Sequence, residues 1–417
     1  MIVVFIHQNF PAQYRLLVRH LADAPENTVY YITQPNENRM QGVIKLIYRA
    51  DAGPRAGCHP YSLEIDDAIR TGTAVADVCR MLSDQGVRPD VIIGHNGWGE
   101  TLFVKDVFPD VPLLALFEFF YHPTGVDIGF DPEFTSIFLE NPSRVRSKNA
   151  INILGHAAAD WGHAATRWQR SLYPAEMRRR ITAIHEGVDT DLLRPDPKAW
   201  IQLARDGLRL TRKDKVITYV SRSLEPYRGF HSFMRALPEI QRRHPTARAL
   251  IVGNDGISYG PPVAPGTTFR DTMLNELGDS LDLERVHFLG PVAYEDYINI
   301  LQVSAVHFYL TYPFVLSWSF IEALSCGCAV LGSSTPPVRE VLKDGVNGLL
   351  VDFFSPQNIA DRVDEVLNHP NRMKKMRETA RKTAVEHFDF KTRMLPLWTE
   401  LLQLLIDGKT PPVDMMG

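Results

Sequence analysis

The chain has 417 residues and carries 45 lysines and arginines against 49 aspartates and glutamates, which gives a formal net charge of −4. This balance argues against a dedicated nucleic-acid-binding protein, and a hydrophobic content of 45% suffices for two sizeable cores. The four cysteines are too few and too scattered for the disulfide framework of a secreted protein, so we expect a reducing, cytoplasmic setting.

Short apolar runs rich in β-branched residues alternate with stretches of helical periodicity along the whole chain. This alternation is typical of parallel sheets covered by helices, so we predict an α/β fold with two doubly wound, Rossmann-like sheets. The first apolar run follows no basic segment and stops at His7, so it predicts a strand and not a signal peptide. The strands of the first series are predicted at 2–7, 29–33, 90–94, 113–117 and 181–184. Those of the second series are predicted at 216–221, 249–253, 286–289, 306–310, 329–332 and 348–351, with helices following at 356–368, 371–387 and 390–406.

Prolines, a glycine and aspartates in the segment 185–197 interrupt both periodicities, which indicates a connection between two domains. We predict one domain at 1–194 and a second at 195–388, with a final helix at 389–410 that crosses back onto the first. Ligands of open parallel sheets bind at the carboxyl ends of the strands, so we expect the ligand site in a cleft between the domains.

Two arginines stand at a predicted strand-to-helix junction in the segment 220–230 (VSRSLEPYRGF). Arg222 follows the strand, and Arg228 precedes Gly229 and a helical pattern. The free amides of a helix N-terminus, the helix dipole and two guanidinium groups together favour binding of a diphosphate. Taken alone, the pattern fits a solvated arginine pair on a turn equally well.

The segment 312–351 leads from a loop into a helix with Glu322 and then, through a Gly-Cys turn, into a buried strand. Together with 220–230, it resembles the carboxyl-terminal half of family 4 glycosyltransferases of the GT-B fold. In that family, a glutamate at the position of Glu322 holds the ribose hydroxyls of the nucleotide. An arginine and a lysine at the positions of Arg222 and Arg228 grip the donor pyrophosphate. Further stretches similar to the family are 184–189, 288–292 and, in a bacterial subgroup, 95–110, 117–134 and 165–174.

The resemblance implies a GT-B architecture, with an acceptor-binding domain at 1–194 and a nucleotide-sugar-binding domain at 195–388 that face each other across a cleft. It implies a retaining transfer of a hexosyl or pentosyl group from a UDP- or GDP-sugar to a hydroxyl of a sugar, lipid-linked, protein or small-molecule acceptor, in bacterial glycan or glycoconjugate biosynthesis. No cofactor, no metal site and no nucleic-acid partner are expected. Two alternatives stay open: another GT-B enzyme such as a sugar-nucleotide epimerase, and a catalytically silent subunit that binds a sugar nucleotide. Basic runs at 178–180 and 372–382 also leave open a peripheral contact with the inner face of a membrane.

One departure from the family pattern concerns the sugar. Eight residues before Glu322 the chain has Phe314, where the commoner pattern has a glutamate that touches the transferred sugar. We expect a differently built sugar pocket, in which the amides of Val315, Leu316 and Ser317 serve the phosphate or a sugar hydroxyl. The same departure is compatible with a donor site that supports no turnover.

The catalytic candidates of the first domain follow the predicted strand 113–117. Glu118 occupies the position of a functional histidine in many relatives, and His122 stands four residues later. Burial of a carboxyl group among aromatic rings raises its pKa, which suits a general base or a clamp on the acceptor hydroxyl. The alternatives are an acid paired with an arginine for Glu118 and a loop-shaping role for His122.

Four more residues are candidates for acceptor binding. Gln8 and Asn9 directly follow the first strand, where the alternative is that they cap the turn. His95 and Glu100 follow the strand predicted at 90–94.

Overall fold

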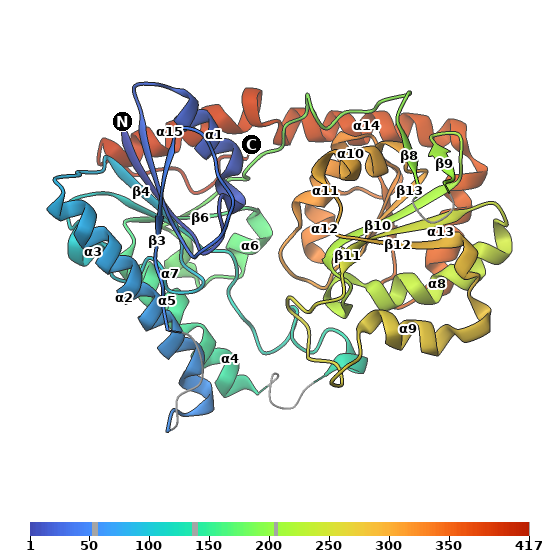
Figure 1. Cartoon of the computed structure of the whole chain (residues 1–417), viewed down its shortest axis with the longest axis horizontal. Helices are drawn as coiled ribbons and strands as arrows, with labels where there is room; N and C mark the ends of the chain where they lie inside the picture. The colour runs from blue at the N-terminus through green and yellow to red at the C-terminus, as the bar shows by residue number, and fades with distance from the viewer. Residues whose placement is uncertain (52–56, 136–140, 204–206, 417) are drawn as a thin grey trace. The chain divides into compact units, whose positions relative to one another are not determined.

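The structure is a computed structural model that describes residues 1–51, 57–135, 141–203 and 207–416. It divides into two compact units (Figure 1). Unit 1 comprises Met1–Ile128, Ile137–Gly187 and Phe390–Gly417, and unit 2 comprises Gly129–Ser136 and Val188–Asp389. The division after Gly187 precedes the predicted boundary at 194, and a short segment of the first half of the chain packs within unit 2.

Unit 1 is built on a parallel sheet, whose described strands follow the order β3-β2-β1-β4-β5-β6-β7. The strands are β1 (Ile2–Ile6), β2 (Thr28–Thr33), β3 (Val43–Ile47), β4 (Val91–His95), β5 (Leu113–Leu116), β6 (Trp161–Ala164) and β7 (Ile181–Ala183). The chain runs outward from β1 to β2 and β3, and then returns to place β4 on the other side of β1. The carboxyl ends of β1 and β4, with Ile6 opposite Gly94, therefore form the switch point at which such sheets bind ligands.

Helices cover both faces of this sheet. They are α1 (Arg15–Asp23), α2 (Leu63–Asp84), α3 (Val104–Val107), α4 (Pro142–Lys148), α5 (Ala150–Ala158), α6 (Arg167–Ser171), α7 (Ala175–Arg178) and α15 (Leu395–Ile406). Leucine and valine side chains of α1 share one core with α15, in which Trp398 is 1% exposed. The opposite core contains Val75, Cys79 and Leu82 of α2. The last helix thus completes the core of unit 1, preceded by a short π-helix at Phe390–Met394.

Unit 2 repeats this architecture with a parallel sheet in the order β12-β11-β10-β13-β14-β15 among its described strands. They are β10 (Val216–Ser223), β11 (Arg248–Asn254), β12 (Val286–Gly290), β13 (Val306–Tyr309), β14 (Val330–Ser333) and β15 (Leu349–Val351), beside an antiparallel pair of β8 (Trp200–Gln202) and β9 (Arg209–Thr211). The helices are α8 (Phe230–Arg243), α9 (Phe269–Leu277), α10 (Tyr294–Val303), α11 (Trp318–Ser325), α12 (Pro336–Val341), α13 (Pro356–Asn368) and α14 (Pro370–Phe388). The switch point lies between β10 and β13, so the loops after these two strands are the expected ligand loops.

The predicted α/β fold with two Rossmann-like sheets is confirmed. Every predicted strand is present with its ends within two residues of the expected positions, whereas β3, β6, β8 and β9 were not predicted. None of the described helices is both long enough and apolar enough to cross a membrane.

Candidate functional site

The switch point of unit 2 begins with a turn that only glycine can complete. Strand β10 ends at Ser223, a 3-10 turn spans Pro226–Arg228, and Gly229 adopts a left-handed conformation with a φ of 66° directly before α8. A Cβ atom on Gly229 would lie 2.4 Å from the Cβ of Leu310, so a side chain is excluded there. The turn delivers the N-terminus of α8, with its free amide groups, to the carboxyl end of the sheet.

Arg228 is fixed in this turn by neutral groups. Its guanidinium donates to Oγ1 of Thr311 at 3.1 Å and to the carbonyl of Val315 at 2.9 Å. The same group lies 5.4 Å from the ring centre of Tyr259 and 5.8 Å from that of Phe314, in cation–π contact. Arg228 forms no ion pair with any carboxylate in the described part of the chain. The buried Glu225 carboxylate acts on Arg228 electrostatically but forms no ion pair with it, so the guanidinium can still bind an anion directly.

Arg222 shares the turn but not this environment. Its side chain is exposed, and its backbone carbonyl accepts from Nδ2 of Asn254 at 2.6 Å. Within the described residues the Arg222 guanidinium makes neither a hydrogen bond nor an ion pair. Of the two predicted phosphate ligands, Arg228 is held by neighbouring groups and Arg222 is exposed.

Phe314 is packed and does not form an open apolar wall. It is 5% exposed, and its ring centre lies 4.8 Å from that of Tyr259 and 5.5 Å from that of Tyr227. Among the three predicted amides, that of Ser317 already donates to Oη of Tyr309 at 2.6 Å. The amides of Val315 and Leu316 donate to no acceptor within the described residues. Two of the three amides thus remain available to a ligand.

Glu322 is held by a pair of tyrosines that the sequence analysis missed. The carboxylate is 7% exposed on α11, and it accepts from Oη of Tyr294 at 3.0 Å and from Oη of Tyr297 at 2.6 Å. The two tyrosines stand three residues apart on α10, so they share one face of that helix. This Tyr-x-x-Tyr spacing after the segment 288–292 was the available signal.

Two histidines occupy the switch point of unit 1. His7 follows β1 and its Nδ1 accepts from the amide of Asn9 at 2.8 Å, while His95 ends β4 and its Nδ1 accepts from the amide of Gly97 at 2.9 Å. Trp98 stacks on His95 with the ring centres 4.1 Å apart. Because both Nδ1 atoms are acceptors, each neutral ring carries its proton on Nε2. Both Nε2 atoms are buried and have no hydrogen-bond partner in the part of the chain that is described.

Glu118 joins this cluster. Its Oε2 lies 3.6 Å from Nε2 of His95, and its Oε1 accepts from Nε2 of Gln13 at 3.2 Å. Its side chain is 28% exposed, so the predicted burial among aromatic rings is only partial. The carboxylate that the sequence placed in an apolar setting is therefore accessible at the edge of the sheet.

Two other carboxyl groups are more deeply buried. Oε1 of Glu100 accepts from the amide of Gln8 at 3.2 Å, and burial raises the pKa of Glu100 to about 6. Glu186, which the sequence analysis did not select, has its pKa raised to about 7, mainly by burial and further by the charge of Glu118. Unit 1 thus contains three carboxyl groups, those of Glu118, Glu100 and Glu186, that differ in burial.

The remaining candidates do not join the cluster through their side chains. Nε2 of His122 bonds to the carbonyl of Leu172 at 2.8 Å, which fits the loop-shaping alternative. The side chains of Gln8 and Asn9 make no hydrogen bond within the described ranges, so they do not cap the turn. His7 and Glu100 accept the two turn amides instead.

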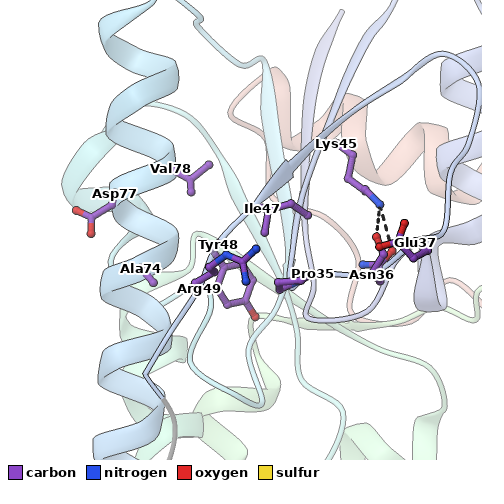
Figure 2. A pocket seen from close by; sticks show the side chains of 10 residues that line it. All are labelled: Pro35, Asn36, Glu37, Lys45, Ile47, Tyr48, Arg49, Ala74, Asp77 and Val78. Carbon is purple, nitrogen blue, oxygen red and sulfur yellow. Dashed lines mark hydrogen bonds between the residues drawn. The ribbon is translucent and has the colours of Figure 1, made fainter.

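A separate hollow of about 550 Å³ lies in unit 1 beside β3 and α2 (Figure 2). The ammonium group of Lys45 points to the neighbouring loop, where it donates to the carbonyls of Asn36 at 2.7 Å and Asn38 at 2.6 Å. None of the candidate residues lines this hollow, so it is not part of the proposed site.

The two halves of the chain match two adjacent family models. "Glycosyl transferase family 4 group" matches residues 25–193, and "Glycosyl transferases group 1" matches residues 202–383. Curated relatives include D-inositol 3-phosphate glycosyltransferases from Mycobacterium sp. (strain KMS), 28% identical over 50% of this chain and 43% of the relative, and from Mycolicibacterium smegmatis, 30% identical over 48% and 42%. The match thus spans less than half the length of these relatives.

Solved structures are similar over nearly the whole chain. Sucrose-phosphate synthase from Thermosynechococcus elongatus has a TM-score of 0.70 at 16% identity and covers 98% of this chain and 100% of its own. HepE from Anabaena, solved with UDP, has a TM-score of 0.65 at 15% identity and covers 97% of this chain and 100% of its own. These likenesses show the GT-B fold that was predicted, and the family models extend over both units. The chain therefore belongs to the family 4 glycosyltransferases.

Proposed function

We propose that the protein is a retaining glycosyltransferase that moves a sugar from a UDP- or GDP-sugar to an acceptor hydroxyl. The observation that carries this proposal is the setting of Arg228. Its charge is partly buried, held by two neutral acceptors and unpaired with any described carboxylate, at the N-terminus of α8. A diphosphate would supply an anion in direct contact with the guanidinium.

The donor would bind to the loops after β10 and β13 of unit 2. Arg228, the exposed Arg222 and the amides of Val315 and Leu316 would share the negative charge of the pyrophosphate. Stabilisation of charge on the leaving group by preorganised donors is usually the largest catalytic term, and here it requires no metal ion. The solved complexes of HepE with UDP and with UDP-glucose support a sugar nucleotide as the donor.

Glu322 would bind the ribose. Its two oxygens already accept one tyrosine hydroxyl each, and a carboxylate oxygen has room for a second hydrogen bond. Two ribose hydroxyls could therefore be added without displacing Tyr294 or Tyr297.

The acceptor would bind at the switch point of unit 1. Glu118 is exposed enough to meet a hydroxyl, and Gln13 and His95 orient it from two sides. The buried Nε2 protons of His7 and His95 could donate to further acceptor oxygens. The inositol phosphate in the names of the curated relatives supports an acceptor with several hydroxyl groups.

Thermal unfolding with a panel of UDP- and GDP-sugars tests the donor, since ligand at 100 times its Kd adds about 2.7 kcal/mol to the free energy of unfolding. Each stabilising donor is then incubated with polyol and sugar acceptors, and the products are separated. Glycoside formation with the donor's anomeric configuration is expected. Release of an epimerised sugar would favour the epimerase alternative, and tight binding without turnover would favour the silent subunit. A failure of every donor to bind would overturn the proposal.

A further inference from the structure

A short piece of the first half of the chain is part of unit 2. The described part of this piece, Gly129–Thr135, contains a 3-10 turn at Pro132–Phe134 and is called here the docked segment. Asp131 begins the turn, and its Oδ1 accepts from the amide of Glu133 at 3.0 Å. The docked segment thus presents Asp131 in a fixed orientation.

The other carboxylate oxygen of Asp131 is shared by two side chains of unit 2. Oδ2 lies 2.9 Å from Nε2 of His231 and accepts from Oη of Tyr312 at 3.0 Å. All three side chains are at least 95% buried. Burial opposes the ionisation of Asp131, but its bonds with His231, Glu133 and Tyr312 outweigh burial and hold its pKa below the ordinary value. A buried charge with this many partners fixes the groups around it.

The two partners belong to the two loops that hold Arg228. His231 lies in the first turn of α8, three residues after Arg228. Tyr312 follows Thr311, which accepts from the Arg228 guanidinium, and the amide of Tyr312 donates to the carbonyl of Tyr227 at 3.0 Å. One carboxylate from the first half of the chain therefore ties the loop after β10 to the loop after β13.

We propose that Asp131 is a positioning residue for the donor diphosphate, which sets the spacing of the two loops that carry Arg228 and its acceptors. The proposal rests on the proposed function, because it concerns the site where the sugar nucleotide would bind. Asp131 itself touches neither Arg228 nor, in this proposal, the donor.

The docked segment offers a matched control. Glu133 forms a two-bond ion pair with Arg235, at 2.6 Å for each bond, and Arg235 also pairs with Glu276 at 2.6 Å. The Glu133 side chain is 45% exposed, and the pair lies on the outer part of α8. Glu133→Gln removes a polar anchor of the docked segment without touching either donor loop.

The experiment compares the full-length wild type with Asp131→Asn, Tyr312→Phe and Glu133→Gln. The Kd values of UDP, UMP, GDP and GMP are measured by calorimetry, and thermal unfolding checks the fold. Whichever pair binds the wild type, UDP with UMP or GDP with GMP, is then measured with each of the three variants. In Asp131→Asn the spacing of the two loops should be lost, which should raise the Kd of the diphosphate by roughly tenfold or more. The Kd of the monophosphate should rise less. Tyr312→Phe removes one hydroxyl and keeps the ring. It should also raise the ratio of the diphosphate Kd to the monophosphate Kd.

Glu133→Gln should leave both affinities unchanged. Equal weakening of the monophosphate and the diphosphate would overturn the positioning role, since it would indicate general loosening of the unit. Wild-type diphosphate affinity in Asp131→Asn would also overturn it, as would an equal loss in Glu133→Gln. If Asp131→Asn does not fold, the test rests on Tyr312→Phe, and an unchanged ratio of diphosphate Kd to monophosphate Kd in that variant overturns the proposal. If the wild type binds no nucleotide, the proposed function fails and this inference fails with it.

Discussion

The rings of His7 and His95 meet edge to face at the ends of two adjacent parallel strands, with their centres 5.0 Å apart. Each ring accepts a turn amide two residues ahead through Nδ1, and Nε2 of His95 lies 3.6 Å from Oε2 of Glu118. Burial and the neighbouring His95 hold the pKa of His7 well below its ordinary value, and the ring stays neutral. Imidazole groups beside the Glu118 carboxylate suit recognition of hydroxyl groups.

Glu118→Gln should spare donor binding and slow transfer by ~10²–10⁴-fold, since the side chain could still bond to a hydroxyl but could not accept its proton. His122→Ala should have a smaller effect on transfer, because the ring bonds to the Leu172 carbonyl and not to the cluster. Donor Kd and transfer rate, measured in parallel for both variants, decide the assignment. Full transfer in Glu118→Gln would exclude it as the base and direct attention to His7 and His95.

Arg228→Ala should weaken donor binding strongly, by ~1.5–3 kcal/mol for each charged hydrogen bond lost to the pyrophosphate. Arg228→Lys should be milder, because an ammonium keeps the charge although it cannot bridge Thr311, Val315 and the ligand at once. Arg222→Ala should also weaken binding, but less than Arg228→Ala, because Arg222 must be ordered on binding. Nucleotide titrations at a fixed ionic strength measure these differences. Unchanged Kd values in both alanine variants would refute the donor site.

Glu322→Gln should weaken nucleotide binding by ~1.5–3 kcal/mol for each charge-assisted bond to the ribose that is lost. The fold should survive, since an amide keeps one acceptor for a tyrosine hydroxyl and a hydroxyl can accept from the amide nitrogen. A comparison with the matching 2′,3′-dideoxynucleotide separates the ribose from the base. The variant and the wild type should bind that analogue about equally.

Glu186→Gln should change how stability depends on pH. The pKa of Glu186 rises from 4.5 to about 7 on folding, so the folded state holds a proton that the unfolded state releases between these values. The free energy of unfolding of the wild type therefore falls as the pH rises from about 4.5 to about 7. Glutamine, which has a similar shape, does not titrate and causes no such fall. The free energy of unfolding of Glu186→Gln should exceed that of the wild type by a margin that widens across this window. An identical pH profile in both proteins would contradict the assignment.

Trp398→Ala should destabilise unit 1 by ~3–5 kcal/mol, the usual cost of removing a large buried ring. The indole is 1% exposed, donates to the His185 carbonyl at 3.0 Å and lies 5.0 Å from the ring of His163. Urea unfolding measures the loss, with Val413→Ala on the surface of the same terminal segment as the control. A change below 1 kcal/mol for Trp398→Ala would show that α15 contributes little to the core.

The sequence predicts those parts of the fold whose signal is local. In the strand predicted at 216–221, every residue except Ser221 is β-branched or aromatic, so the local pattern suffices to predict it. The edge strand β3 carries Lys45 in its centre and has no fully buried residue, and β6 (WGHA) has no β-branched residue at all. Both are strands because of their neighbours, a tertiary effect that no local pattern contains.

The same limit applies to the site. Arg228 and Glu322 could be selected because each stands in a short motif with a physical reason for its residue type. The bond between Asp131 and Tyr312 joins positions 181 residues apart, and that between Tyr297 and Glu322 joins positions 25 apart. Such pairings depend on the completed sheet order, so only the structure brings them together.

The position of α15 has a consequence for the order of events during synthesis. Unit 1 contains the beginning of the chain, yet its core includes Leu401, Leu402 and Leu405. All segments of unit 2 have left the ribosome once Asp389 has emerged. At that point unit 1 still lacks α15 and the part of its core that this helix supplies. Nascent chains arrested before and after residues 395–406 have emerged should therefore differ in the protease resistance of the amino-terminal sheet, although that sheet was translated first.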